Sequence, residues 1–175
     1  MQETVTSIVK DQEHDEEMVQ RLLEFRAFCD KLCEEAFVDV IKEGLHESTK
    51  PAASPVKPGS SSLATAKPAA TRVPNKDFKY ATIDAFSMGF KARRNKPAEM
   101  IAKYLDRAMR KGQKGKRDEE FQAELDAALG LYRFTDDKDV FRTFYHRALA
   151  KRLLLERSAS DDFEKAMLKR LKESE

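Results

Sequence analysis

Residues 134–172 read FTDDKDVFRTFYHRALAKRLLLERSASDDFEKAMLKRLK, and this stretch decides the fold. Its first half repeats apolar side chains at positions i, i+3, i+4, i+7 and i+8, a spacing that places them on one face of an α-helix. These residues are Phe141, Phe144, Tyr145, Ala148 and Leu149, and Leu153 extends the stripe. We therefore predict an amphipathic helix that buries this face against neighbouring helices.

Capping residues and charges mark the ends of this helix and the corner that follows it. Thr135 or Asp136 is a suitable N-cap, and cations follow near the C-terminal end, where the helix dipole favours them. The cations are Arg147, Lys151 and Arg152. In the corner at 158–162, Ser160 is the candidate N-cap of a second helix. The apolar face of that helix comprises Phe163, Ala166, Met167 and Leu171. So short a corner makes the two helices fold back on each other.

Two more amphipathic helices are predicted just before this stretch. Asn95 caps the first, with Pro97 in its first turn, and Asp118 caps the second. The first helix has an apolar face made of Ile101, Tyr104, Leu105, Ala108 and Met109, and the second one made of Phe121, Leu125, Ala128, Leu129 and Tyr132. Four helices with short connections pack as antiparallel neighbours, so we predict a helical bundle over residues 95–175.

The composition divides the chain before the bundle into three parts. Residues 1–46 are predicted to carry one long helix from His14 to Leu45 with a heptad-like apolar seam, while Val5, Ile8 and Val9 are compatible with an incoming helix. The seam comprises Met18, Leu22, Phe25, Cys29, Leu32 and Ala36. Residues 47–75 are rich in Pro, Ala and Ser and lack aromatic side chains, which predicts a disordered linker. Residues 76–94 return to helix, with Phe78, Ile83, Phe86 and Phe90 as its apolar residues.

Several segments resemble the cullins, the scaffold subunits of RING-type ubiquitin ligases. The patterns are DKDVF-x-x-FY-x-x-x-LAKRLL and SAS-x-D-x-E-x-x-M-x-x-x-LK, which begin at Asp137 and Ser158. The resemblance extends to NKPAEMIAKY at 95–104, to LYRF at 131–134 and, more loosely, to MVQRLLEF at 18–25. The sequence of residues 133–172 is most similar to the fourth class of cullins in fungi. The resemblance implies an all-α fold: the end of the third cullin repeat, followed by a four-helix bundle, with the linker as an insertion that departs from the family pattern.

No catalytic, cofactor-binding or metal-binding constellation is recognisable, so no residue is assigned to any of these roles, and no binding residue is assigned. Cys29 and Cys33 lie one helical turn apart, where a disulfide is geometrically poor. We interpret them as core or boundary thiols, with metal or redox use as the alternative. His146 is interpreted as a boundary residue rather than a general base, and the acidic residues 136, 137 and 139 as capping groups. Free thiols favour a cytoplasmic or nuclear location.

The balance of acidic and basic residues limits the classes of partner that this protein is expected to bind. There are 33 basic and 31 acidic residues, a net charge of +2, which argues against a dedicated binder of nucleic acid or membrane. The strongest contrary signal is the basic octet RKGQKGKR at 110–117, which we interpret as a solvated loop between helices. No apolar run approaches the length of a transmembrane helix.

The resemblance implies a non-catalytic scaffold segment in protein ubiquitination and ubiquitin-dependent degradation. The expected protein partners of the full-length parent are a RING-box protein, an adaptor and an exchange factor, and this segment is not expected to hold all of them. Neither a cofactor nor a small-molecule substrate is expected. Two alternatives stay open: a stand-alone helical module that competes with an intact cullin, and a nucleic-acid-associated helical protein that uses the basic octet.

Overall fold

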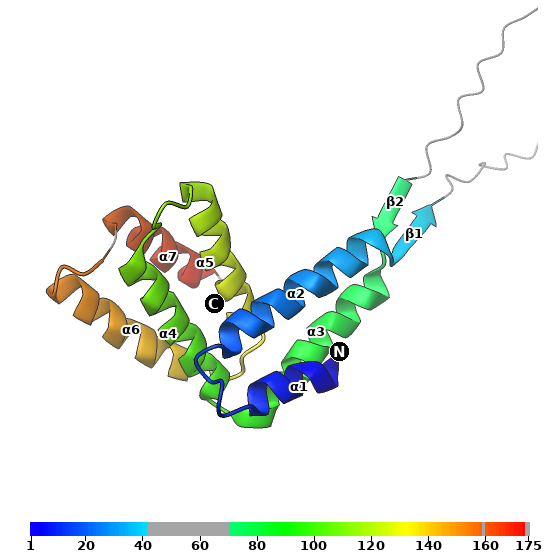
Figure 1. Ribbon diagram of the computed structural model, residues 1–175, viewed down its shortest axis with the longest axis horizontal. Helices are drawn as coiled ribbons and strands as arrows, with labels where there is room; N and C mark the ends of the chain where they lie inside the picture. The colour runs from blue at the N-terminus through cyan, green and yellow to red at the C-terminus, as the bar shows by residue number, and fades with distance from the viewer. Residues whose placement is uncertain (42–70, 159, 174–175) are drawn as a thin grey trace, which may run out of the picture.

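A computed structural model describes residues 1–41, 71–158 and 160–173, which form a helical hairpin and a helical bundle set at an angle to it (Figure 1). The first part contains α1 Gln2–Lys10, α2 Met18–Glu35, β1 Val38–Ile41, β2 Thr71–Pro74, α3 Lys76–Phe90 and the short 3₁₀ helix η1 Lys91–Arg93. The bundle contains α4 Lys96–Lys111, α5 Asp118–Tyr132, α6 Lys138–Leu154 and α7 Asp161–Glu173. The predicted all-α fold is confirmed.

The hairpin consists of α2 and α3, and the ribbon β1–β2 continues it outward (Figure 1). The two strands are antiparallel, with Val38 opposite Pro74 and Ile41 opposite Thr71. Asn75 caps α3, since its side chain accepts a hydrogen bond of 2.9 Å from the main-chain N–H of Phe78. Helix α1 packs against α3 at Gly89, where an added Cβ would lie only 2.5 Å from a methyl carbon of Val5. Glycine is therefore what permits this close approach.

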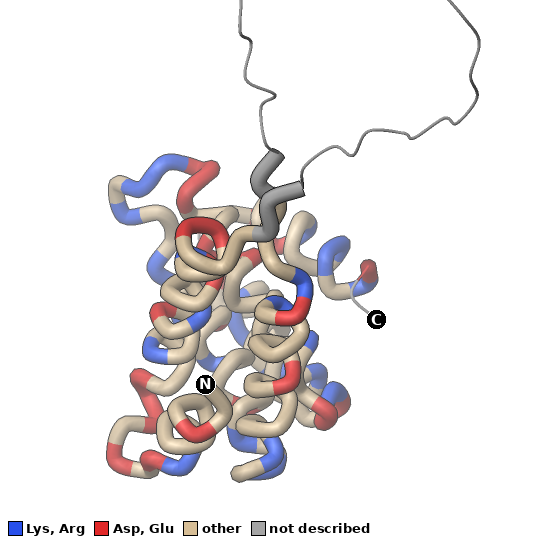
Figure 2. Tube along the Cα trace, turned by 90° about the vertical axis from the view of Figure 1, so that its right-hand side faces the viewer, with Lys and Arg blue, Asp and Glu red and all other residues tan. Residues whose placement is uncertain are grey.

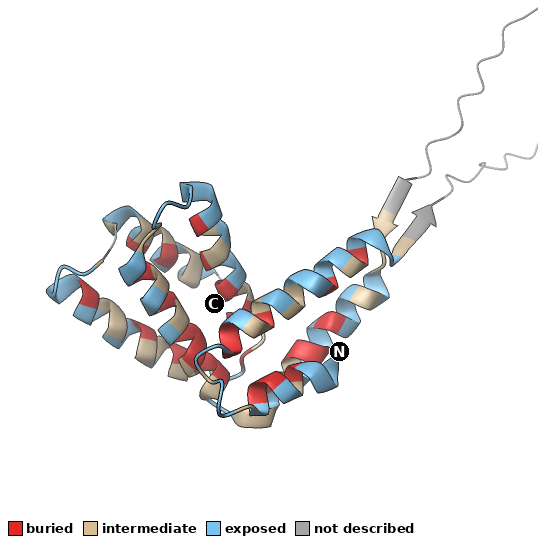
Figure 3. Ribbon diagram, viewed as in Figure 1, coloured by how far each residue is buried: buried red, intermediate tan, exposed pale blue. Residues whose placement is uncertain are grey.

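The four helices of the bundle enclose an apolar core that continues into the base of the hairpin (Figure 3). Aromatic pairs join consecutive and distant helices: Tyr132 to Phe141 at 4.4 Å between ring centroids, and Phe121 to Phe163 at 5.1 Å. The buried apolar residues of α4 are Ala98, Met100, Ile101, Ala102, Leu105 and Met109. The predicted face of α4 is thus confirmed at Ile101, Leu105 and Met109.

The prediction of one helix from His14 to Leu45 is wrong. The helix α2 begins only at Met18, after a turn at residues 12–17, and ends at Glu35 before strand β1. The incoming helix with which Val5, Ile8 and Val9 are compatible is confirmed as α1. Val5 and Val9 are fully buried and Ile8 nearly so, because α1 packs on α3. The seam periodicity is confirmed only in part, since Met18, Leu22 and Cys29 are buried while Ala36 is exposed.

The predicted linker at 47–75 lies outside the described residues from 47 to 70. Residues 71–74, assigned to it from composition, form strand β2. Pairing with Val38–Ile41 explains the difference, because Thr71 and Val73 are residue types that favour strands and composition alone does not reveal a partner strand.

Two of the predicted caps are displaced by one or two residues. The N-cap of α6 is Asp137 rather than Thr135 or Asp136, and Thr135 is buried, donating its hydroxyl proton to the carbonyl of Tyr132 at 2.7 Å. Asp118 lies inside α5, whose N-cap position is held by Arg117. Ser160 directly precedes α7, which begins at Asp161, as predicted.

Besides Ala36, two residues predicted on apolar faces are in fact solvent-exposed. Ile83 is 44% exposed and Leu153 is 50% exposed. In α6, Phe141 and Tyr145 are buried as predicted, whereas Phe144, Ala148 and Leu149 are half-buried at the rim of the core.

Candidate functional site

The region that determines the shape of the molecule is the joint between the hairpin and the bundle. We define it as the end of α3, η1 and the first turn of α4, together with the α1–α2 loop and the α5–α6 loop that lie against them. The chain passes from α3 to α4 through only five residues, 91–95, of which three form η1. The joint is therefore a short, structured bend and not a flexible linker.

An aromatic cluster fills the inside of this bend. Phe134 of the α5–α6 loop lies 5.3 Å from Phe86 and 6.4 Å from Phe90, measured between ring centroids. Phe25 of α2 adds a contact of 6.1 Å to Phe86, and the guanidinium of Arg26 lies 5.1 Å above the ring of Phe134. The cluster thus connects α2, α3 and the α5–α6 loop by contacts that each contribute about 0.5–1.5 kcal/mol beyond burial.

A carboxylate in the α1–α2 loop binds two cations of the bend. Asp15 accepts hydrogen bonds of 2.5 and 3.2 Å from the two terminal nitrogens of Arg93, and its second oxygen lies 3.2 Å from the ammonium of Lys96. Arg93 also donates to the carbonyl of Val9 at 3.1 Å. The hydrogen bonds from Arg93 are the main reason why the pKa of Asp15 lies below its usual range. All three charged side chains are 20–26% exposed, so solvent screens them only in part.

Asn95 occupies an unusual conformation at the centre of the bend. Its φ is 67°, a left-handed value that costs a non-glycine residue on the order of 1–3 kcal/mol. Its side chain makes no capping hydrogen bond to α4, although the residue holds the predicted N-cap position. Its main-chain N–H donates instead to the carboxylate of Asp137 at 3.0 Å, which joins the bend to the start of α6.

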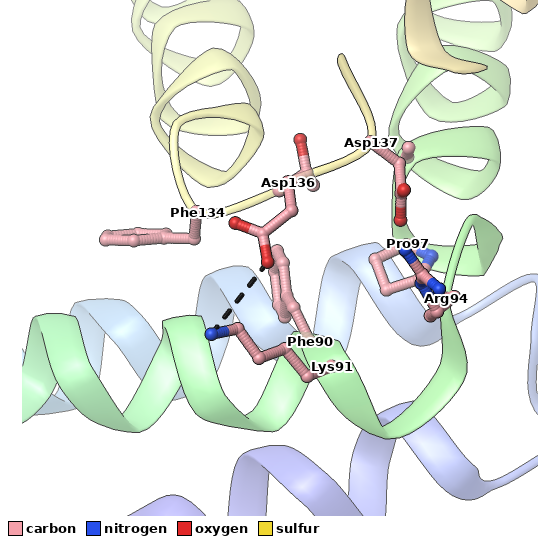
Figure 4. A pocket seen from close by; sticks show the side chains of 9 residues that line it. Phe90, Lys91, Arg94, Pro97, Phe134, Asp136 and Asp137 are labelled. Atoms are coloured by element: carbon pink, nitrogen blue, oxygen red, sulfur yellow. Dashed lines mark ion pairs between the residues drawn. The ribbon is translucent and has the colours of Figure 1, made fainter. Parts of the chain in front are cut away.

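A pocket of about 300 Å³ opens on one side of the joint (Figure 4). Phe90, Pro97 and Phe134 provide its apolar surface, and Lys91 and Asp136 form an ion pair of 3.9 Å across it. This separation is long for a salt bridge between exposed side chains, so the pair contributes little. The joint is closely held at the α1–α2 loop and loosely held at the pocket.

A second polar cluster lies inside the bundle and was not predicted from the sequence. It comprises Arg152, Asp106 and Glu164, and we call it the buried triad. Arg152 of α6 is fully buried and donates to Glu164 of α7 at 2.8 and 3.0 Å and to Asp106 of α4 at 2.5 Å. Ser158 donates its hydroxyl proton to the same Glu164 at 2.8 Å. Three helices therefore meet at one guanidinium.

Arg152 is a cation in the last turn of α6, as predicted, but its burial was not predicted. Its position could have been inferred, because residue 152 follows Phe141, Tyr145 and Ala148 at i+11, i+7 and i+4 on the apolar stripe. A charged residue on that stripe indicates a buried partner. The partners themselves, Asp106 and Glu164, lie on other helices, where no local pattern reveals them.

The structure does not combine the remaining candidates into a site. Cys29 and Cys33 are buried and free, and burial is the main reason why the pKa of the Cys29 thiol is raised. Among the described residues, no group of three or more His, Cys, Asp or Glu side chains is placed to hold a metal ion. His146 is exposed, beside Tyr145. Asp136 and Asp137 are used in the joint, and Asp139 lies in the first turn of α6.

The basic octet at 110–117 is partly neutralised by acids of the adjoining helices. Arg110 pairs with Asp106 at 2.7 Å and Lys116 with Glu124 at 2.5 Å. Figure 2 shows acidic and basic residues interleaved along the helices. Such interleaving disfavours a phosphate-binding surface, which needs uncompensated cations. In the part of the chain with described coordinates, no helix is both long and apolar enough to cross a membrane.

Comparison with known proteins now identifies the family. The cullin family model, described as the cullin alpha solenoid domain, matches residues 1–175. The chain belongs to the cullin family. This cullin chain is 36% identical to human Cullin-4A over 173 residues, which cover 95% of the chain and 17% of the human protein.

Two further relatives match about half of this cullin chain. Cullin-4 of Dictyostelium discoideum is 41% identical over 93 residues, covering 53% of the chain and 12% of that protein. Cullin-3 of Caenorhabditis elegans is 41% identical over 98 residues, covering 56% of the chain and 12% of that protein. The chain thus spans 17% or less of the length of these relatives. Since both class-three and class-four cullins match, membership of the fourth class in fungi stays a prediction.

Proposed function

We propose that this segment is a non-catalytic spacer in a cullin scaffold of a RING ubiquitin ligase, where it fixes the direction between the parts on either side. Membership of the cullin family supports the ligase context. The observation that carries the spacer role is the joint: α3 passes to α4 through a five-residue bend held by contacts from three other segments.

A fixed bend is useful to a scaffold for a physical reason. When two bound groups are held by a rigid connection of the right length, the second encounter becomes intramolecular and its effective concentration is high. A flexible connection spreads the same groups over a larger volume and lowers that concentration. In this proposal the segment contributes geometry, and the chemistry belongs to the conjugating enzyme that a RING-box protein recruits.

The compartment and the partners follow as part of the same proposal. We place the protein in the cytoplasm or nucleus, because its two cysteines are free thiols. The RING-box protein, the adaptor and the exchange factor are proposed as partners of the full-length parent.

A chimera tests the spacer role. The aligned segment of human Cullin-4A is replaced by this chain, and ligase activity is measured with purified components. The unaltered chimera is expected to support substrate ubiquitination. Insertion of six Gly/Ser residues between Arg94 and Asn95 is expected to lower substrate ubiquitination by about tenfold or more, since the effective concentration falls with flexibility.

The matched control carries the same insertion between Ser60 and Ser61, inside the predicted linker, and is expected to retain activity. Binding of the RING-box protein should be unchanged in both chimeras. An insertion at the joint that leaves ubiquitination intact contradicts the spacer role. So does capture of a RING-box protein and substrate ubiquitination by the 175-residue chain alone.

A further inference from the structure

Two carboxylates from different segments hold the bend at Asn95. Asp15 binds a residue on each side of it, Arg93 before and Lys96 after. Asp137 accepts a hydrogen bond from the main-chain N–H of Asn95 itself. Within residues 93–96, every residue except Arg94 thus forms an ion pair or a hydrogen bond with one of these two acids. We call this arrangement the brace.

We propose that Asp15 and Asp137 are positioning residues that set the direction of the hairpin relative to the bundle. The inference rests on the proposed spacer function and specifies which residues perform it. A non-glycine residue with φ of 67° persists only where its surroundings hold it there. Loss of either carboxylate lets Asn95 relax to a negative φ, and this rotation reorients everything before it.

The brace suits this role better than the aromatic cluster does. Contacts among Phe86, Phe90 and Phe134 are apolar, and the hydrophobic effect is non-directional, so rings can slide while staying buried. The guanidinium of Arg93 instead presents a planar fork to both oxygens of Asp15, a geometry that specifies orientation. The cluster therefore holds the two parts together, and the brace determines their angle.

The structure also indicates the direction of movement when the brace is lost. The pocket beside Phe90 and Pro97 leaves about 300 Å³ between the end of α3 and the α5–α6 loop (Figure 4). The ion pair between Lys91 and Asp136 across it is long, at 3.9 Å, and both side chains are more than half exposed. A movement of the hairpin that closes this pocket meets less packed protein than a movement of the hairpin toward the α1–α2 loop.

Distances between spin labels test the proposal on the full 175-residue chain. Labels are attached through a ketone-bearing amino acid, so that the cysteines stay intact, at exposed Lys79 of α3 and exposed Lys165 of α7. A second pair at Glu119 and Lys165 reports on the bundle alone. The parent chain is expected to give one narrow distance peak for each pair.

Asp15→Asn and Asp137→Ala are each expected to broaden or shift the hairpin-to-bundle peak and to leave the bundle peak unchanged. Asp137 holds the N-cap position of α6 but makes no side-chain capping hydrogen bond there, so its replacement removes no such bond. Arg93→Lys, which keeps the charge and loses the fork, should broaden the peak less than Asp15→Asn does. Circular dichroism confirms that each variant remains helical.

Asp11→Asn is the matched control. Asp11 lies in the same loop and is also ion-paired, but its partners His14 and Arg21 belong to the hairpin side, so the hairpin-to-bundle peak should not change. If Asp15→Asn and Asp137→Ala keep the narrow parental peak, the brace is refuted and the spacer function stands. A broad peak in the parent chain refutes the spacer function itself.

Discussion

Ion pairs hold both the joint and the interior of the bundle. The two sets of ion pairs differ in how much of each side chain is exposed to solvent. In the buried triad, Arg152 is fully buried and Glu164 is nearly so. In the brace, Asp15 and Arg93 keep about a fifth of their side-chain surface in solvent. Removing a partner from a buried pair leaves an uncompensated charge, whereas water can replace a partner at a partly exposed pair. The triad should therefore govern whether the bundle folds, and the brace should govern which way the hairpin points.

The largest effect is expected from Arg152→Leu. It leaves Asp106 and Glu164 facing each other without their shared cation, so the free energy of unfolding should fall by about 3–5 kcal/mol. Urea denaturation followed by circular dichroism measures the change. Lys151→Leu, at the exposed neighbouring position, serves as the control and should change stability by less than about 0.5 kcal/mol. An Arg152 variant as stable as this control would show that the triad is not needed for folding.

A smaller effect is expected from Phe134→Ala in the joint. The ring contacts Phe86, Phe90 and Arg26 but is only half-buried, so we expect a loss of about 2 kcal/mol, below that of a fully buried phenylalanine. Phe28→Ala is the matched control, because that ring is 57% exposed and its loss should be close to neutral. Equal effects of the two substitutions in urea denaturation would mean that the cluster does not hold the joint.

Asp15→Asn is expected to cost at most about 1 kcal/mol, because the ion pairs that it removes are partly solvated. In the parent chain the pKa of the Asp15 carboxyl is below the usual value of 3.8, so the native state favours the charged form. The stabilisation is therefore present above that value and is lost as the pH falls below it. Urea denaturation of parent and variant should give curves that converge as the pH falls below that value; a constant difference down to acid pH would contradict this.

The smallest effect concerns His14 in the exposed turn before α2. The hydrogen bond that His14 donates to the Asp11 carboxylate is the main reason why the pKa of His14 lies above 6.5, so the protonated form is favoured in the native state. The stabilisation is present below pH 6.5 and disappears as the pH rises through the native pKa. Histidine proton shifts measured by NMR should give a pKa that falls in Asp11→Asn.

The helices of the bundle were predictable because their information is local. The i, i+3, i+4, i+7 spacing of Phe141 and Tyr145, and that of Ile101 and Leu105, follows from the helical period alone and correctly indicates the buried face. The same local logic failed at residues 14–45. There the apolar pattern is compatible with one long helix, but residues 12–17 form a turn and Val38–Ile41 pair with strand β2, a partner that no local pattern reveals.

What the sequence alone determined was the family, the helical class and most apolar faces, since each depends on residues close together in the chain. Tertiary structure alone decided the long-range charged contacts. Asp15 meets Arg93 across 78 residues of sequence, Arg152 meets Asp106 across 46, and no periodicity relates these positions. Hydrophobic burial needs only a face of the right width, whereas an ion pair needs one particular partner at hydrogen-bond distance. Partner choice of this kind is fixed only when the helices have packed.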